Sequence, residues 1–571
     1  MFKALNAIPD ESHYDFVVVG AGVAGMAAAV FAAMQDKKVL LVEHTEYVGG
    51  SSALSAATVW IPNTHHAAAV SKDDSLEKAS AFLSAAVGNR SPSKLRDAFL
   101  HSGPEAVAAL EANSDVKFRP YATHPDYEQQ FEGATLRGRA LEPVPFDGRA
   151  LGDTLKCLRP PIPEFTLFGG MMVHRVDINH LLGLRKSWKS FAHATRILGR
   201  YGIDRLSGSR GTRLVMGNAL IGRFLLSIGK KGVDIVTQTS VREILADGDD
   251  VRGVVLVGGG FTRRIRASRG VILAAGGYGR HKTRRGEMLH HPVPEFSPTA
   301  PGSTGEMQDL ALALGARFGD GNMDNAFWAP VSVRRRKDGT TAVFPHFVMD
   351  RSKPGTVCVN QEGRRFVNES CSYHLFARAM FENHRKAPSI PCYIITDAVG
   401  LKRYGLGMVR MGAGSIQPLV DEGYLVKASS IGELARSLDI PLGALDQTIS
   451  DMNNYATTGI DPEFGRGTTA YHRVNGDGSR GGPNPTLGPI TSPPFYAVRL
   501  FPGDIGTATG LVTDEWARVL GSGDQPIGGL YACGNEANSI MGGVYPAPGI
   551  TIGPAIIFAY RAIRHALGGS A

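Results

Sequence analysis

Cysteine is scarce in this chain, and its scarcity excludes several classes of protein. The 571 residues include only five cysteines, which are widely spaced and form no CxxC pair. An odd number of scattered thiols does not suit a disulfide framework, a zinc finger or an iron–sulfur cluster. We therefore expect reduced thiols and a cytoplasmic protein.

Long apolar runs and a strong charge of one sign are also missing. No segment reaches the roughly 18 consecutive apolar residues of a membrane-spanning helix, and the N-terminus lacks the hydrophobic core of a signal peptide. The net charge is only +8, and the short basic run at 334–337 is typical of a solvated loop. We expect no nucleic-acid partner, whereas peripheral contact with an acidic membrane surface stays open.

What the chain does contain begins with a dinucleotide-binding motif. An apolar strand at 15–19 (DFVVV) leads into the glycine turn 20–25 (GAGVAG) and an alanine-rich helix. Gly20 permits the tight turn, Gly22 lets the backbone approach a pyrophosphate, and Gly25 lets the helix pack on the strand. A second strand at 38–42 ends at Glu43, where a ribose-binding acid is expected. A plain glycine-rich turn beside a surface glutamate is the weaker alternative.

Glycine-rich segments further along the chain favour FAD over NAD, because an extended FAD needs additional contacts. The segment 549–554, at the start of the last predicted helix, can offer backbone amides and a helix dipole to the flavin pyrimidine edge. The expected FAD contacts are Gly20, Gly22, Ala24, Gly25, Glu43, Gly50, Ser51, Ser52, Ala275, Gly276, Gly534, Asn535, Glu536, Ile550 and Ile552.

The order of predicted elements indicates an α/β fold. Helices are expected over 76–113 and 178–229, with strands at 233–236, 251–257, 270–273 and near 529–533. We predict a discontinuous, Rossmann-like FAD-binding domain, formed by residues 1–296 and 501–571. An α+β substrate or catalytic domain, residues 297–500, is inserted between its two parts.

Eight segments resemble the fumarate reductase/succinate dehydrogenase flavoprotein superfamily, and within it the 3-ketosteroid Δ1-dehydrogenases. They are 49–52 (GGSS), 60–63 (WIPN), 210–218 (RGTRLVMGN), 365–369 (RFVNE), 494–498 (PFYAV), 502–504 (PGD), 510–513 (GLVT) and 545–554 (YPAPGITIGP). The resemblance implies an FAD-dependent oxidoreductase that acts on CH–CH bonds and introduces the 1,2-double bond of a 3-ketosteroid. It also implies an external electron acceptor, with a quinone as one candidate.

The same resemblance implies the catalytic residues. The family pairs a tyrosine hydroxyl with a glycine amide around the substrate carbonyl, and Tyr545 and Gly549 match that pair. The family's base is a tyrosine after the RFVNE segment, which corresponds to Tyr373. Tyr127 is the best match for a supporting tyrosine, with Tyr121 as its competitor. Each of these tyrosines can alternatively be an ordinary buried aromatic residue.

Several departures leave the substrate open. His124 stands where some relatives carry a tyrosine, Ala56 and Ala57 replace a glycine pair, and the segment 343–348 differs from the usual aromatic run. A smaller cyclic ketone is therefore an alternative substrate. A fumarate-reductase-like C=C reductase and an electron-transfer flavoprotein subunit are alternative functions.

Two further expectations concern aromatic and histidine residues. Trp60, Trp328 and Phe347 are candidates for an apolar pocket, with ordinary core packing as the alternative. No histidine stands beside the GGSS segment in the arrangement used for covalent flavin attachment, so we expect non-covalent FAD. The pairs at 65–66 and 290–291 have no second set at metal-ligand spacing in the sequence, so no metal site is expected.

Overall fold

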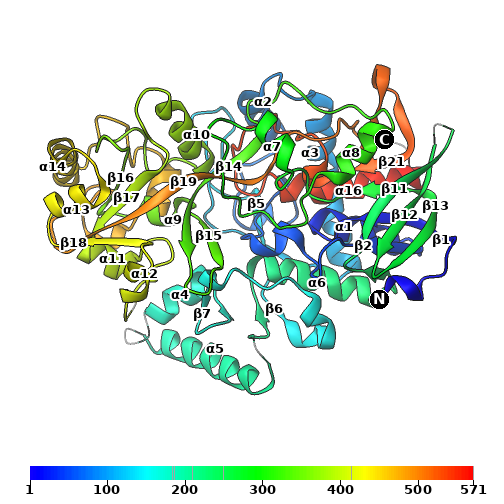
Figure 1. The fold of residues 1–571 in the computed structure, drawn as a ribbon, viewed down its shortest axis with the longest axis horizontal. Helices are drawn as coiled ribbons and strands as arrows, with labels where there is room; N and C mark the ends of the chain where they lie inside the picture. Colours follow the sequence, from blue (N-terminus) through cyan, green and yellow to red (C-terminus); the bar gives the residue numbers. More distant parts are fainter. Residues whose placement is uncertain (183, 185–186, 209, 249, 413, 570–571) are drawn as a thin grey trace.

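Two β-sheets, at opposite sides of the molecule in Figure 1, organise the fold. The computed structural model describes residues 1–569 apart from 183, 185–186, 209, 249 and 413. The first sheet consists of β10 (Asp234–Val236), β2 (Val39–Val42), β1 (Ser12–Val19), β13 (Phe261–Leu273), β12 (Asp250–Gly258), β21 (Pro526–Ala532), β20 (Arg518–Leu520) and β11 (Ser240–Asp247).

The centre of this sheet is parallel and buried on both faces. Strands β10, β2, β1, β13 and β21 run parallel, and residues 16–19 of β1 pair with the apolar residues 39–42 of β2 and with 270–273 of β13. Helix α1 (Val23–Ala33) is wholly buried and packs against α6 (Met216–Lys230) and α16 (Ile552–Ala566). Because a parallel strand buried on both faces needs apolar residues throughout, the continuous run at 15–19 is explained. The predicted Rossmann-like sheet, completed by a C-terminal strand, is confirmed.

The second sheet is antiparallel. Its strands are β15 (Thr341–Pro345), β14 (Ala326–Arg335), β19 (Phe495–Thr507), β17 (Cys392–Asp397), β16 (Thr356–Val359) and β18 (Leu425–Ala428). The long strand β19 crosses residue 500, where the sequence predicted a domain boundary. The division of the chain into domains at 297 and 500 stays a prediction. Around this sheet lie α9 (Val348–Arg351), α10 (Tyr373–His384), α11 (Ala398–Tyr404), α12 (Gln417–Asp421), α13 (Ile431–Leu438), α14 (Leu442–Thr458) and α15 (Ala470–Asn475).

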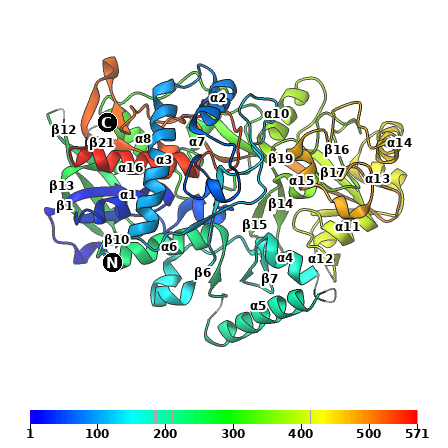
Figure 2. The same cartoon turned by 180° about the vertical axis from the view of Figure 1, so that it is seen from behind.

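Smaller elements fill the space between and below the two sheets (Figures 1 and 2). A three-stranded sheet is formed by β3 (Val59–Trp60), β5 (Ala140–Pro143) and β4 (Phe118–Pro120), and two-stranded pairs by β6 (Phe146–Asp147) with β9 (Arg213–Leu214) and by β7 (Thr166–Leu167) with β8 (Met171–Met172). The remaining helices are α2 (Leu76–Val87), α3 (Ser93–Asn113), α4 (Arg175–Leu182), α5 (Trp188–Ser207), α7 (Lys282–Met288) and α8 (Glu306–Ala313).

The predicted helical regions are each divided. The region 76–113 forms two helices, because the chain turns at Gly88, whose φ is 63°, before α3 begins. The region 178–229 contains α4, α5 and α6, and its residues 183, 185–186 and 209 lie outside the described part. Among the described residues, no helix combines the length and the apolar character needed to cross a bilayer.

All five cysteines are free thiols. Cys358, Cys392 and Cys533 are buried, and Cys157 and Cys371 are partly buried. Burial raises the pKa of each thiol, to about 12 for Cys371 and Cys533.

The RFVNE segment folds around a buried network of charges. Arg365 bonds Glu369 at 2.8 Å and Asp461 at 2.9 Å, and Arg466 lies 3.2 Å from the same Glu369 carboxylate. Burial would raise the pKa of Glu369, but the two arginines hold it below its ordinary value. This network anchors the chain four residues before Tyr373.

Replacing Arg365 should therefore destabilise the fold. The change Arg365→Ala leaves the buried Asp461 carboxylate without its cation and leaves Glu369 with Arg466 alone, which costs about 3–5 kcal/mol. Denaturant unfolding followed by fluorescence measures the loss. The matched control is the exposed neighbour Arg364→Ala, expected within about 0.5 kcal/mol of wild type. Equal stability of the two variants would contradict the prediction.

Candidate active site

A large cavity extends from the carboxyl ends of the parallel strands to the second sheet. Its volume is about 1960 Å³. Pockets for one small molecule usually measure roughly 300–1,000 Å³. The cavity therefore has room for a dinucleotide and a second molecule together.

Most of the residues predicted to contact FAD line this cavity. Those that line it are Gly20, Gly22, Ala24, Glu43, Gly50, Ser51, Ser52, Ala275, Gly276, Gly534, Asn535 and Ile552. Three others lie behind its wall. Gly25 packs so tightly that a Cβ there would lie 1.9 Å from the Gly20 carbonyl oxygen. Ile550 and Glu536 are buried.

The local geometry around these residues fits a dinucleotide. Gly20 has a φ of 104°, and a Cβ there would lie 2.3 Å from the Ala274 carbonyl oxygen, so only glycine suits the turn. The position of a Cβ on Gly22 is open, since its nearest neighbour would be 4.0 Å away. The Glu43 carboxylate accepts the Ala21 amide at 3.0 Å, which holds it beside the turn.

Glu536 supports the loop that follows β13. Its carboxylate accepts a hydrogen bond from the Gly277 amide at 3.0 Å, and burial raises its pKa to about 7. The cradle of amides and open glycine positions fits FAD, and its non-covalent attachment stays a prediction.

Three tyrosines meet in the wall of the same cavity. The hydroxyls of Tyr127 and Tyr373 are 3.4 Å apart. The Tyr545 ring lies 5.1 Å from the Tyr373 ring and 6.1 Å from the Tyr127 ring, measured between centroids. All three side chains line the cavity, as does Gly549. The structure thus brings together the four residues that the sequence assigned to catalysis.

The electrostatics of the tyrosines follow from their burial. Burial raises the pKa of Tyr373 well above that of a free phenol, and Tyr127 and Tyr545 raise it further. Burial also raises the pKa of Tyr545, although the Tyr373 hydroxyl and the Gly549 amide oppose that change.

Backbone hydrogen bonds fix this arrangement. The Tyr127 amide donates to the Pro546 carbonyl at 2.7 Å, and the Trp60 amide donates to the Gly549 carbonyl at 3.2 Å. Gly549 has a φ of 85°, and a Cβ there would lie 2.3 Å from the Thr58 carbonyl oxygen. Tyr373 is the first residue of α10, whose N-cap is Ser372.

Asp126 is a positioning residue that the sequence did not reveal. It is buried, accepts the Trp60 indole N–H at 2.9 Å and pairs with Arg139 at 3.0 Å. Burial raises its pKa to about 6, against the opposing effect of Arg139. Because Asp126 precedes Tyr127, this network fixes the backbone from which Tyr127 projects.

The aromatic candidates for the pocket divide into two groups. Phe347 lines the cavity, with its ring 5.0 Å from Tyr373. Trp60 and Trp328 are fully buried and belong to the packed core, so the core alternative holds for both. Tyr121 also lines the cavity, but Tyr127 is the tyrosine whose hydroxyl meets Tyr373.

The positions that depart from the relatives are close to the site. His124 lines the cavity, and its ring lies between Tyr121 at 4.6 Å and Tyr127 at 6.1 Å. Ala57 also lines the cavity and has a φ of 54°, a conformation that favours the glycine it replaces.

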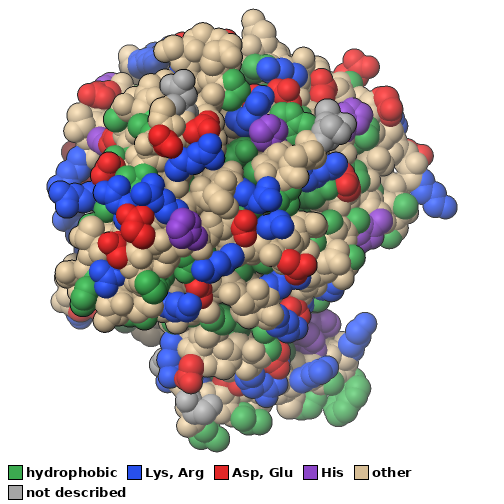
Figure 3. Space-filling model, turned by 90° about the vertical axis from the view of Figure 1, so that its right-hand side faces the viewer, with side chains coloured by type: hydrophobic (Ala, Val, Ile, Leu, Met, Phe, Trp, Pro, Cys, Tyr) green, Lys and Arg blue, Asp and Glu red, His purple; other side chains and the backbone are tan. Residues whose placement is uncertain are grey.

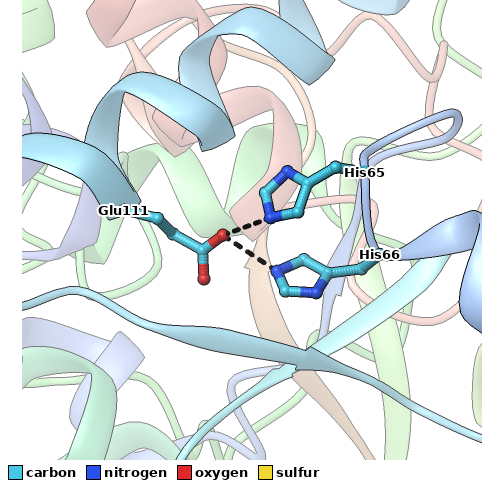
Figure 4. Close-up of side chains that lie close together, drawn as sticks. All are labelled: His65, His66 and Glu111. Carbon is cyan, nitrogen blue, oxygen red and sulfur yellow. Dashed lines mark hydrogen bonds and ion pairs between the residues drawn. The ribbon is translucent and has the colours of Figure 1, made fainter.

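Away from the cavity, His65 and His66 converge on Glu111 (Figure 4). Both imidazoles lie within hydrogen-bonding distance of one carboxylate oxygen, at 2.8 and 2.9 Å, and the other oxygen accepts the Phe118 amide at 2.7 Å. The sequence did not reveal Glu111 as a third group for this histidine pair. The three can hold a metal ion, although hydrogen bonding alone accounts for their geometry. His290, in the other pair, bonds Asp324 at 2.6 Å.

Comparison with known proteins shows the family to which the chain belongs. The family model described as "FAD binding domain" matches residues 15–552. The chain is 36% identical over 555 residues to 4-oxocyclohex-2-ene-1-carboxylate 5-dehydrogenase from Sinomonas cyclohexanicum, covering 96% of this chain and 93% of that one. It is 33% identical over 561 residues to 3-oxosteroid 1-dehydrogenase from Mycolicibacterium smegmatis, covering 96% of each.

A solved structure of a related enzyme has a similar fold. The fold matches the crystal structure of 3-ketosteroid delta1-dehydrogenase from Sterolibacterium denitrificans in complex with 1,4-androstadiene-3,17-dione. The TM-score is 0.90 and the identity 33%, over 97% of this chain and 99% of that one. The chain belongs to the 3-oxosteroid 1-dehydrogenase family of FAD-dependent oxidoreductases, which act on CH–CH bonds.

Proposed function

We propose that this chain introduces the 1,2-double bond of a 3-ketosteroid. One observation carries the proposal: Tyr127, Tyr373, Tyr545 and Gly549 line the same cavity as the residues of the dinucleotide cradle. Relatives named for a steroid ketone and for a smaller cyclic ketone both support the reaction type.

The carbonyl end of the substrate is assigned to Tyr545 and Gly549. The Tyr545 hydroxyl and the Gly549 amide can both donate hydrogen bonds to the C3 oxygen. These bonds strengthen as negative charge develops on that oxygen, so they stabilise the enolate more than the ketone. The C2–H bond becomes more acidic as a result.

The proton from C2 is assigned to Tyr373. Its ionised phenol accepts the proton, and the Tyr127 hydroxyl, 3.4 Å away, can pass it on. FAD, when bound in the cradle, supplies the acceptor for the hydride that leaves C1. An external acceptor, for which we propose a quinone, receives the electrons afterwards.

A smaller cyclic ketone with a carboxylate is the second candidate substrate. Arg119, Lys402 and Arg403 line the cavity and can attract such an anion. Arg119 and Arg403 are already paired, with Glu142 and Asp477, and this makes them weaker anion sites. The apolar side chains Phe165, Phe344 and Phe347 favour a fused-ring substrate.

A panel of ketones tests the substrate. Under anaerobic conditions, the bound flavin should lose its visible absorbance with a saturated 3-ketosteroid. Cyclohexanone and 4-oxocyclohexanecarboxylate should leave it oxidised. Bleaching by the carboxylate but not by the steroid would reverse the assignment, and no bleaching by any ketone would end it.

Tyrosine variants test the assigned roles. Tyr373→Phe should lower the rate of anaerobic flavin reduction by about 10²–10⁴-fold, as expected for loss of a general base. Tyr545→Phe should lower it by about 10²–10³-fold, because one hydrogen bond to the developing enolate is lost. The matched control is Tyr471→Phe. Tyr471 lies 4.7 Å from Tyr127 between ring centroids but does not line the cavity, so its rate should match wild type.

The pH dependence follows from the raised pKa of Tyr373. Because the phenol must lose its proton before it acts as a base, and burial makes that loss harder, the active fraction is small at neutral pH. The rate of flavin reduction should rise continuously from neutral pH to about pH 10. A rate independent of pH over this range, with chemistry rate-limiting, would exclude Tyr373 as the base.

A further inference from the structure

The histidine pair at 65–66 meets Glu111 outside the cavity (Figure 4). Both imidazole Nε2 atoms are aimed at one oxygen of the Glu111 carboxylate, at 2.8 and 2.9 Å. The ligand atoms of the three side chains all lie within 4.8 Å of one another. Tetrahedral ligands of Zn²⁺ stand about 3.4 Å apart, so each nitrogen has to withdraw from the oxygen by only about half an ångström to admit the ion.

The arrangement at Glu111 differs from the other histidine–carboxylate groups of the chain. At Asp177 and at Asp324, two histidines approach opposite oxygens of the carboxylate, and an arginine pairs with each of these aspartates. At Glu111 both histidines share one oxygen, and no lysine or arginine among the described residues pairs with the carboxylate. Its second oxygen accepts the Phe118 amide, which holds the carboxylate in place. The Glu111 carboxylate is therefore an anchored anion without a permanent cation as its partner.

The position of Glu111 in α3 also favours a cation. Helix α3 ends at Asn113, and the carbonyl groups at a helix C-terminus carry partial negative charge, so an acidic side chain there is unfavourable unless a cation lies nearby. The last turn of α3, which the structure describes in full, contains no basic residue. Lys117 bonds the main-chain carbonyl of Glu111 and not its carboxylate. A divalent ion between the carboxylate and the imidazoles would balance both negative groups.

A metal ion can reach this place from solvent. The His65 side chain is 52% exposed, whereas His66 and Glu111 are more sheltered, at 18% and 12%. Two imidazoles and one carboxylate leave a position of a tetrahedral ion open for water. This ligand set suits Zn²⁺, while Mg²⁺ and Ca²⁺ require oxygen ligands.

The rest of the surface offers a divalent ion little competition. On the face shown in Figure 3, basic and acidic side chains are intermingled, and the whole chain has a net charge of +8. Charge attraction alone therefore does not hold a cation on this face, and tight binding needs converging ligands. Among the described residues, His65, His66 and Glu111 are the one group of three His, Cys, Asp or Glu side chains that converges in this way. We expect one ion per chain.

We propose that His65, His66 and Glu111 bind one Zn²⁺ ion, with water completing its coordination. The proton that each Nε2 donates to the carboxylate leaves that atom, and the neutral imidazole keeps its proton on Nδ1. The Glu111 oxygen that faced both histidines becomes the third ligand. The other oxygen keeps the Phe118 amide, which orients the ligand.

The ion clips together two parts of the chain that are far apart in sequence. The histidines follow β3, and Glu111 stands 45 residues after His66, in α3. Trp60, the last residue of β3, donates its amide to the Gly549 carbonyl at 3.2 Å, so the clip holds a segment that supports the active site. The three ligands do not line the cavity, so the role of the ion is structural. A structural ion stabilises the fold to which it binds.

Zinc titration of the FAD-loaded enzyme tests the site. After treatment with EDTA and removal of the chelator, calorimetric titration with zinc chloride should give one ion per chain. Thermal unfolding should move to a higher temperature as the zinc concentration is raised. Magnesium chloride should cause neither effect, because Mg²⁺ prefers oxygen ligands. A wild-type enzyme that binds no zinc would overturn the proposal.

Ligand variants locate the ion. His65→Gln should weaken zinc binding by about tenfold or more, a loss that is typical even of an outer-shell partner. Because this side chain is half exposed, the variant should fold as the wild type does. His66→Gln and Glu111→Gln should weaken binding at least as much, and zinc should no longer raise their unfolding temperature. Undiminished affinity in His65→Gln would place the ion elsewhere and refute the assignment.

Matched controls come from the same helix. His101 and Glu105 are exposed residues of α3 outside the site. His101→Gln and Glu105→Gln remove the same chemical groups as the ligand variants, and both should bind zinc as the wild type does. Equal loss of binding in these controls would show general surface binding and would also overturn the proposal.

The rate of flavin reduction separates a structural ion from a catalytic one. Whichever ketone reduces the flavin, its rate should be the same with and without zinc, because the ligands lie outside the cavity. Loss of flavin reduction on removal of zinc would contradict the structural role. Zinc binding is measured without substrate, so its outcome does not depend on the proposed function.

Discussion

The attachment of the segment 545–549 to two other parts of the chain is the constraint on which the site depends. Its carbonyl groups accept the amides of Tyr127 and Trp60, which come from the N-terminal third of the sequence. The glycine at 549 permits that contact, because any side chain there would collide with the Thr58 backbone. One short segment thereby sets the positions of Tyr545, Tyr127 and the N-terminus of α16.

Two parts of the cavity wall, the cradle and the group of tyrosines, arise from different kinds of structure. The cradle is built from turns at the carboxyl ends of parallel strands, where ligands of such sheets usually lie. The group of tyrosines is built where α10 begins and where the loops around Tyr127 and Tyr545 meet. Buried charges support the second part, through Arg365 and Glu369 before α10 and through Asp126 before Tyr127. Removing one partner from such a network leaves an uncompensated buried charge, so substitution of these residues destabilises the fold.

The parts that the sequence predicted well are local or strongly patterned. The strand, glycine turn and helix of the dinucleotide motif occupy about 30 consecutive residues, as is usual for a βαβ unit. Tyr373 and Tyr545 stand in dense motifs that the family resemblance identified. Trp60 and Asp126 were not linked, because they are 66 residues apart and meet only through the fold. The segment 119–163 has no periodic pattern, so the choice between Tyr121 and Tyr127 needed the distance between hydroxyls.

The burial of the five thiols has a practical consequence for work with this enzyme. A thiol acts as a nucleophile only when ionised, and all five have a pKa raised by burial. Alkylating reagents therefore react slowly with the folded chain and rapidly once it opens. The buried Cys358, Cys392 and Cys533 therefore serve as chemical markers of unfolding.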